Sequence, residues 1–108
     1  MKFNKSALLA ALKPKTELVD VEGFGKVGII QLTVGEVEKI RADLKAADNA
    51  DQFGLHLVLL SVVDDAGARV FDASDLPGLI DAGHAAMDAL VAKALQVNGF
   101  KKLAEAKN

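Results

Sequence analysis

Three glycines in the first third of the chain have the spacing of a dinucleotide-binding loop. The stretch Gly23-Phe24-Gly25-Lys26-Val27-Gly28 reads G-x-G-x-x-G, which in such folds follows a strand and opens a helix whose N-terminal amides bind the pyrophosphate. Residues 17–22 alternate like a half-buried strand, but residues 27–34 are apolar and β-branched, without helical periodicity. The pattern therefore predicts two strands joined by a glycine turn, a β-hairpin rather than a nucleotide site.

Two histidines are the next candidates for chemistry. His56 lies in an apolar segment, and His84 stands four residues before Asp88, a spacing that puts two side chains on one helix face. A metal site needs at least a third ligand, and no further residue has a fixed spacing to this pair. The sequence favours a hydrogen-bonded core histidine and a surface pair over a metal centre. An enzyme that uses Asp and His stays open as an alternative, without a defined constellation.

Four aspartates surround one predicted turn. Their order does not match a calcium loop, which requires D-x-[DN]-x-[DN]-G and a distal glutamate. Aspartate is common in turns and at helix N-caps, and these two roles explain all four. We therefore expect neither a metal nor a catalytic site at Asp64, Asp65, Asp72 and Asp75.

The composition also argues against most kinds of chemistry. The chain has 108 residues, no cysteine and a net charge of −2, so it has no thiol nucleophile and no basic stripe to neutralise nucleic-acid phosphates. The longest apolar run, residues 55–63, is too short to span a bilayer. The start resembles the first half of a signal peptide, but Lys13-Pro14-Lys15 ends its apolar run early. We expect a soluble intracellular protein without a metal or cofactor.

The elements begin with a short helix. Asn4 or Ser6 is its expected N-cap, and Pro14 stops it after Leu12. A helix this short is marginal alone, so it must dock on its own core or on a neighbouring subunit. The candidate partner-binding residues are Phe3, Leu8, Leu9 and Leu12. Of the two alternatives we slightly favour packing on its own core, because isolated helices this short need tertiary support.

The hairpin, roughly Glu17–Glu22 and Lys26–Leu32, is followed by a helix. Thr33 and Glu36 form a capping box, a Thr N-cap with Glu three residues later. The inward positions of this helix are Val37, Ile40 and Leu44.

The segment Phe53–Val63 fits either a buried strand or a buried helix. We favour a helix, because the segment is long for a strand and leucine outnumbers the β-branched residues. The remaining signals are a turn at Asp64–Gly67, an extended piece at Arg69–Asp72, a short turn capped by Ser74 with Pro77 near its start, and a helix from about Ala82 to Val97 ended by Asn98-Gly99.

These signals together predict a helix-rich α+β fold. It has an N-terminal short helix, one β-hairpin and then about four helices packed in a single small domain over residues 1–108. Residues 1–14 form an N-terminal arm, and residues 101–108 a frayed tail.

The order of these motifs resembles the tail assembly chaperones of long-tailed bacteriophages, over about residues 16–108. The resemblance rests on the hairpin from Glu17 to Gly25, on Leu32–Glu36 before a charged helix, on Asp64–Gly67 with Phe71 beyond it, and on a final helix ending Val97-Asn98-Gly99-Phe100. Each motif alone is a general turn or cap signal, so their order and spacing carry the resemblance. The chain departs from the pattern at Val97, where a leucine is more usual, and Met1–Pro14 matches no motif of the family.

The resemblance implies a non-enzymatic role. Such proteins coat the tape-measure protein in the host bacterial cytoplasm, keep it soluble, help recruit tail-tube subunits, and self-associate as homo-oligomers; they are absent from the finished particle. It implies no cofactor, nucleic acid or membrane. The alternative is a small nucleic-acid-binding or regulatory protein, which needs Lys and Arg clustered on one helix, whereas residues 36–46 alternate in charge.

Overall fold

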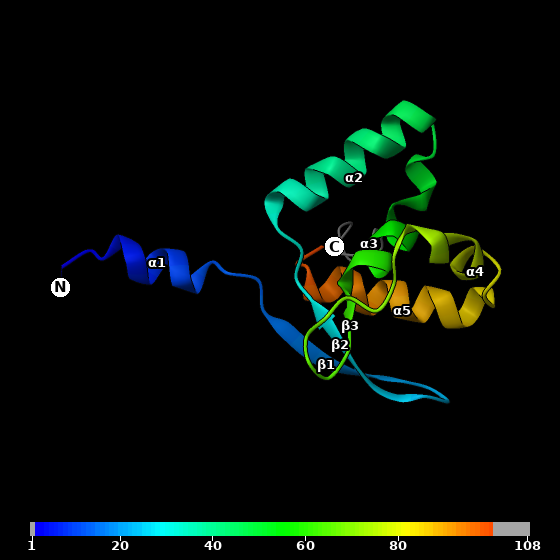
Figure 1. Ribbon diagram of the computed structural model, residues 1–108, viewed down its shortest axis with the longest axis horizontal. Coiled ribbons are helices and arrows are strands. Elements are labelled where there is room, and N and C mark those ends of the chain that lie inside the picture. The colour runs from blue at the N-terminus through cyan, green and yellow to red at the C-terminus, as the bar shows by residue number, and fades with distance from the viewer. Residues whose placement is uncertain (1, 101–108) are drawn as a thin grey trace, which may run out of the picture.

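Helices pack on one side of a small three-stranded antiparallel sheet in the structure, a computed structural model that describes residues 2–100 (Figure 1). The elements are α1 Lys5–Ala11, β1 Thr16–Val21, β2 Gly25–Ile30, α2 Val34–Ala47, the 3-10 turn η1 Ala50–Gln52, α3 Phe53–Ser61, β3 Val62–Val63, the 3-10 turn η2 Ala73–Asp75, α4 Leu76–Ile80 and α5 His84–Val97. The predicted helix-rich α+β class is confirmed. The expected tail at 101–108 lies outside the described residues.

All three glycines of the G-x-G-x-x-G stretch serve the β-hairpin. β1 and β2 pair antiparallel from Thr16↔Ile30 to Val21↔Gly25. Gly23 and Gly25 have φ angles of 83° and 119°, which side-chain-bearing residues rarely adopt. A Cβ at Gly28 would lie 2.9 Å from Val63 Cγ2, so glycine there allows the next strand to approach. The predicted hairpin is confirmed.

The capping box at the start of α2 is also confirmed. The Glu36 amide donates to Thr33 Oγ1 at 3.1 Å, and the Thr33 amide donates to Glu36 Oε1 at 2.9 Å. Ile40 and Leu44 are buried and Val37 is half-buried, so the expected inward face is correct.

The apolar segment Phe53–Val63 divides into two elements. Its first nine residues form α3, as favoured, but Val62 and Val63 form β3 and pair with Ile29 and Gly28 of β2. The helix prediction is therefore wrong for these two valines. Their backbone groups complete the open edge of β2, and their β-branched side chains suit a buried strand.

α3 lies at the centre of the fold. It contacts α2, α4, α5 and β2, and Figure 1 shows α5 running beside it, close to the sheet. The core residues that these elements share are Ile29, Leu57, Val58, Val62, Ala94 and Val97. The predicted stripe on α5 packs against them, with Met87, Leu90, Val91 and Leu95 partly buried.

Local signals predicted the C-terminal end of α5 correctly, but not the N-cap of the turn before α4. α5 stops as expected: Gly99 has φ 82°, and the Phe100 amide donates to Leu95 O at 2.8 Å. At η2, the turn before α4, however, the N-cap is Asp72 and not Ser74. The Asp72 carboxylate accepts the Ser74 amide at 2.9 Å, while Asp75 accepts the Asp72 amide at 2.9 Å. The extended backbone of Asp72 places its carboxylate over the Ser74 amide.

Candidate functional site

The helix α1 stands apart from the rest of the molecule. Asn4, not Ser6, is its N-cap, because Asn4 Oδ1 accepts the Ala7 amide at 3.1 Å. Figure 1 shows α1 extending away from the body, at the end of the sheet opposite the β1–β2 turn. Every residue of α1 is exposed, so the structure decides against docking on its own core.

The four candidate partner-binding residues all lie on this exposed segment. Phe3 is 80% exposed, and the three leucines, Leu8, Leu9 and Leu12, are 45%, 55% and 68% exposed. Leu8 and Leu12 are four residues apart on the helical turn, with Leu9 beside them, so they share one face. This face is apolar and uncovered. Its role in binding stays a prediction.

The same segment is also strongly basic. Residues 2–15, which we name the basic arm, contain Lys2, Lys5, Lys13 and Lys15 and no acidic residue. These are four of the 13 basic residues of the chain, so the remainder has nine basic against 15 acidic residues. The arm is thus net positive, whereas the rest of the chain is net negative.

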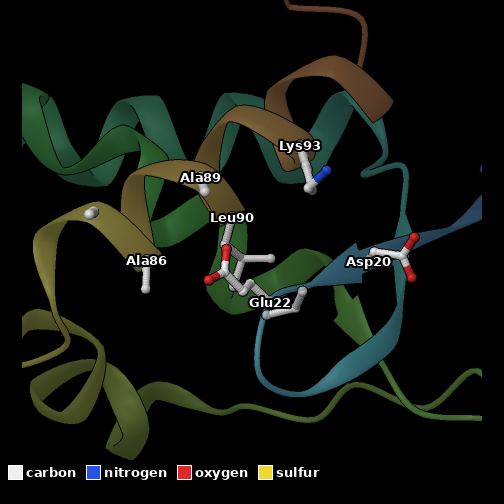
Figure 2. A pocket seen from close by; sticks show the side chains of 8 residues that line it. Asp20, Glu22, Ala86, Ala89, Leu90 and Lys93 are labelled. Atoms are coloured by element: carbon white, nitrogen blue, oxygen red, sulfur yellow. The ribbon is translucent and has the colours of Figure 1, made fainter.

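A groove with an acidic rim lies between the hairpin and α5. Its first part is a cavity of about 620 Å³. Figure 2 shows Glu22, the residue after β1, beside Leu90 of α5, with Ala86, Ala89 and Lys93 on the same helix. The Asp20 carboxylate on β1 borders the cavity but points away from α5. The alanines are exposed and small, so another chain can approach α5 closely on this side.

The second part is a cavity of about 420 Å³ that shares Val21 and Leu90 with the first. Its apolar lining includes Phe24, which is 77% exposed, and Val70, which is 49% exposed. Asp64 and Asp65 add to the rim. We name the two adjoining cavities the acidic groove; its charged residues are Asp20, Glu22, Asp64, Asp65, Lys26 and Lys93.

A third hollow, of about 440 Å³, opens between α3, α4 and α5 on another face of α5. We name it the helical cleft. Its apolar lining includes Phe53, Leu79, Ile80, Met87, Val91 and Leu95. Ile80 is 50% exposed, so part of this apolar lining faces solvent.

No family model, curated protein or solved structure matches this chain. What the protein does must therefore follow from its own surfaces. Across residues 2–100, no helix combines the length and apolar character needed to cross a membrane.

The histidines do not come together with other ligands. His84 and Asp88 both line the helical cleft but form no ion pair in the described part of the chain, and His56 is half-buried in α3. Within residues 2–100 no group of three His, Asp or Glu side chains is placed to hold a metal ion.

The aspartates shape the turns, as expected. Asp64 Oδ1 accepts the amides of Ala66 and Ala68 at 2.9 and 3.0 Å. Hydrogen bonds from the Ser74 hydroxyl and then the Ser74 amide hold the pKa of Asp72 below its usual value. The sequence did not predict that Asp64 and Asp65 also border a groove with Asp20 and Glu22, because that depends on how the hairpin packs on α5.

Sequence reasoning also missed a polar tether at the end of α5. Asn98 Oδ1 accepts the Leu32 amide at 2.7 Å, while its Nδ2 donates to Ala94 O at 2.9 Å and to Ser61 Oγ at 3.5 Å. Gln31 reinforces it, since its Nε2 donates to Val97 O at 3.3 Å. Asn98 was identified as a helix-stop signal only, and no local pattern points to a partner 66 residues away.

An ion pair connects α2 to the loop after β3. Arg69 Nη2 lies 2.9 Å from Glu36 Oε2, with both side chains about one-third exposed (36% and 32%). Partial burial raises the pKa of Glu36, but the hydrogen bond from the Thr33 backbone and the Arg69 guanidinium outweigh it, so the net pKa lies below the ordinary 4.5.

Replacing Glu36 with glutamine is therefore expected to destabilise the fold slightly at neutral pH. Glutamine keeps the capping hydrogen bond but loses the charge that pairs with Arg69, at a cost below about 1 kcal/mol for a pair this exposed. Because the folded-state pKa is lowered, the wild-type advantage is present above 4.5 and is lost as pH falls through the folded-state value. Urea unfolding at pH 7 and in acid measures this. Glu38→Gln, on the exposed side of α2 at a carboxylate with no ion pair within residues 2–100, should cost less stability at pH 7 than Glu36→Gln.

Proposed function

We propose that this protein is a non-enzymatic chaperone of the kind that assists the assembly of the tails of long-tailed bacteriophages. The observation that carries the proposal is the uncovered apolar face of α1, formed by Leu8, Leu9 and Leu12. A soluble protein that exposes such a face on a projecting segment is suited to completing it against another protein. The type of assembly is inferred from the order of sequence motifs over residues 16–108, which resembles that of the tail assembly chaperones.

A client of suitable chemistry is a helix with an apolar stripe. The tape-measure protein of the tail is a long amphipathic helix before the tube encloses it, and its stripe needs a cover in the host cytoplasm. The helical cleft offers apolar side chains for such a stripe, with Ile80 at its exposed side. Many weakly bound copies along one client hold it by avidity, and they leave when tail-tube subunits take their place. The chaperone is then absent from the finished particle.

The acidic groove and the helical cleft lie on different sides of α5. Ala85, Ala86 and Ala89 face the acidic groove, whereas Met87, Asp88 and Val91 line the helical cleft. One copy therefore has room for a client on one face and another protein on the other.

Co-expression tests the proposal. The tape-measure protein from the same genome is expected to be largely insoluble alone, and to become soluble and co-elute with this chain as one large species when both are made. If its soluble yield is unchanged and the two proteins elute separately, the chaperone proposal fails.

Two matched variants test the client surface. Ile80→Asp places a charge in the helical cleft and is expected to lower the rescued yield several-fold. Val34→Asp changes an equally apolar side chain, 76% exposed at the start of α2, and should leave the yield unchanged. If both variants rescue equally well, the client binds elsewhere.

A further inference from the structure

We propose that the basic arm of one copy docks in the acidic groove of a second copy, which links the chains head to tail. This inference goes beyond the proposed function, because it needs no client and is tested on the purified chain alone.

The arm has no place to bury its leucines in its own groove. Lys15 is held beside β2 by two hydrogen bonds, from its amide to Gln31 Oε1 at 3.1 Å and from the Gln31 amide to Lys15 O at 2.9 Å. The segment that precedes β1 therefore runs away from Val21, and a turn that brought it back along the sheet would take about four residues. Such a turn would use residues 12–15 and leave the end of α1 beside Lys15.

From there the groove remains out of reach. Val21 lies six residues along the strand from Lys15, which is about 20 Å at the rise of a β-strand. A helix of seven residues is about 10 Å long, so Leu8, Leu9 and Leu12 stop short of the groove. The groove that the arm enters must belong to another molecule.

The groove matches the arm in both apolar and charged character. Val21 and Leu90 form an apolar floor shared by its two cavities, and Phe24 extends that floor with a side chain that is 77% exposed. The exposed alanines of α5 leave room for a helix backbone to approach (Figure 2). The leucines of an incoming arm can therefore pack on this apolar floor of the groove.

Charge selects the arm as the occupant. The groove carries four carboxylates and two lysines; Lys26 and Asp20 pair with each other at 3.2 Å, which leaves three carboxylates against Lys93. Glu22 and Asp65 make no ion pair within residues 2–100. The arm brings four lysines and no acidic residue, so its docking places opposite charges around an apolar contact and favours this partner over a neutral helix.

The geometry has a consequence for assembly. The arm leaves the hairpin at the end opposite the β1–β2 turn (Figure 1), whereas the groove is lined by Val21 and Phe24 at that turn. The two surfaces are therefore different. Contacts of this heterologous kind generate rings or open chains, not closed two-fold dimers.

Two complementary variants test the contact by sedimentation velocity on the full chain. Leu9→Asp with Leu12→Asp removes the arm's apolar face but leaves the groove, and Ala89→Arg blocks the groove but leaves the arm. Each is expected to be monomeric at concentrations where the wild type forms higher species. Mixed together, they should form a one-to-one heterodimer and nothing larger, because only one intact arm and one intact groove face each other.

Controls separate this result from loss of folding. Ala46→Arg makes the same substitution on an exposed position of α2 and should associate like the wild type, and circular dichroism should be the same for all variants. Raising the salt from about 0.1 M to about 1 M shortens the Debye length from about 10 Å to about 3 Å and should weaken wild-type association several-fold. A wild type that is monomeric up to millimolar concentration overturns the proposal, as does a variant that still associates or a mixture that stays monomeric.

Discussion

Replacing Leu57 with alanine is expected to lower the free energy of unfolding by about 2–5 kcal/mol. Leu57 is 0% exposed in α3 and belongs to the core cluster with Ile29, Val58 and Ala94. Truncation removes buried methyl groups and leaves a cavity that neighbours on several elements cannot all close. Since α3 contacts α2, α4, α5 and β2, the loss is felt across the whole fold. Urea unfolding followed by circular dichroism measures it.

The matched control is the same substitution in the arm. Leu9→Ala removes an equal number of atoms from a side chain that is 55% exposed, so in dilute monomer it should change stability by less than about 0.5 kcal/mol. A large loss at Leu9 would mean that α1 packs on the core, against the structure. At concentrations where copies associate, Leu9→Ala should instead reduce the concentration-dependent part of the stability, because binding of a second copy stabilises the folded chain.

Asn98→Ala is expected to cost about 2 kcal/mol, a large effect for a polar residue outside the apolar core. The Asn98 amide joins three parts of the fold: the Leu32 backbone before α2, the end of α5 at Ala94, and Ser61 at the end of α3. Alanine leaves the part-buried Leu32 amide without its acceptor at 2.7 Å. Most of the lost stability comes from leaving this part-buried amide without a hydrogen-bond acceptor. Thermal and urea unfolding report it directly.

Two variants make this test specific. Asn98→Asp keeps an acceptor for the Leu32 amide, but its ionised carboxylate cannot donate to Ala94 O and adds a part-buried charge. We expect this variant to lose less stability at acidic pH, where the carboxyl is protonated, than at neutral pH, and to lose less than Asn98→Ala at acidic pH. Asn49→Ala removes an asparagine that is exposed beyond α2 and whose side chain makes no hydrogen bond within residues 2–100. If Asn49→Ala costs as much as Asn98→Ala, the tether is not the cause.

The two proposed surfaces fit a common mode of action. The acidic groove and the helical cleft use different faces of α5, so arm-linked copies still present their clefts to a client. Linked copies bind an extended helix as one multivalent surface, whose avidity exceeds the affinity of any single cleft. A double variant with Leu9→Asp and Leu12→Asp should therefore reduce client rescue while the individual clefts stay intact.

The sequence by itself determined the features that depend on neighbouring residues. The glycine turn of the hairpin, the Thr33–Glu36 capping box and the Asn98-Gly99 helix end were all predicted, because each is decided by φ angles and hydrogen bonds within a few residues. The helix at the start of Phe53–Val63 also followed from local preference. At Ser74 the local signal was ambiguous, since Asp72 nearby is an equally good cap.

Only the tertiary structure decided what depends on distant partners. Val62 and Val63 left the helix because the edge of β2 was open to pair with them. The carboxylates of β1 and of the Asp64–Gly67 turn came to border one groove through the packing of the hairpin on α5. The apolar face of α1 stayed exposed because Gln31 holds Lys15 and directs the chain away from the body. The physical reason is common to all three: an apolar or charged side chain specifies the kind of partner it needs, whereas the fold specifies which partner lies within reach.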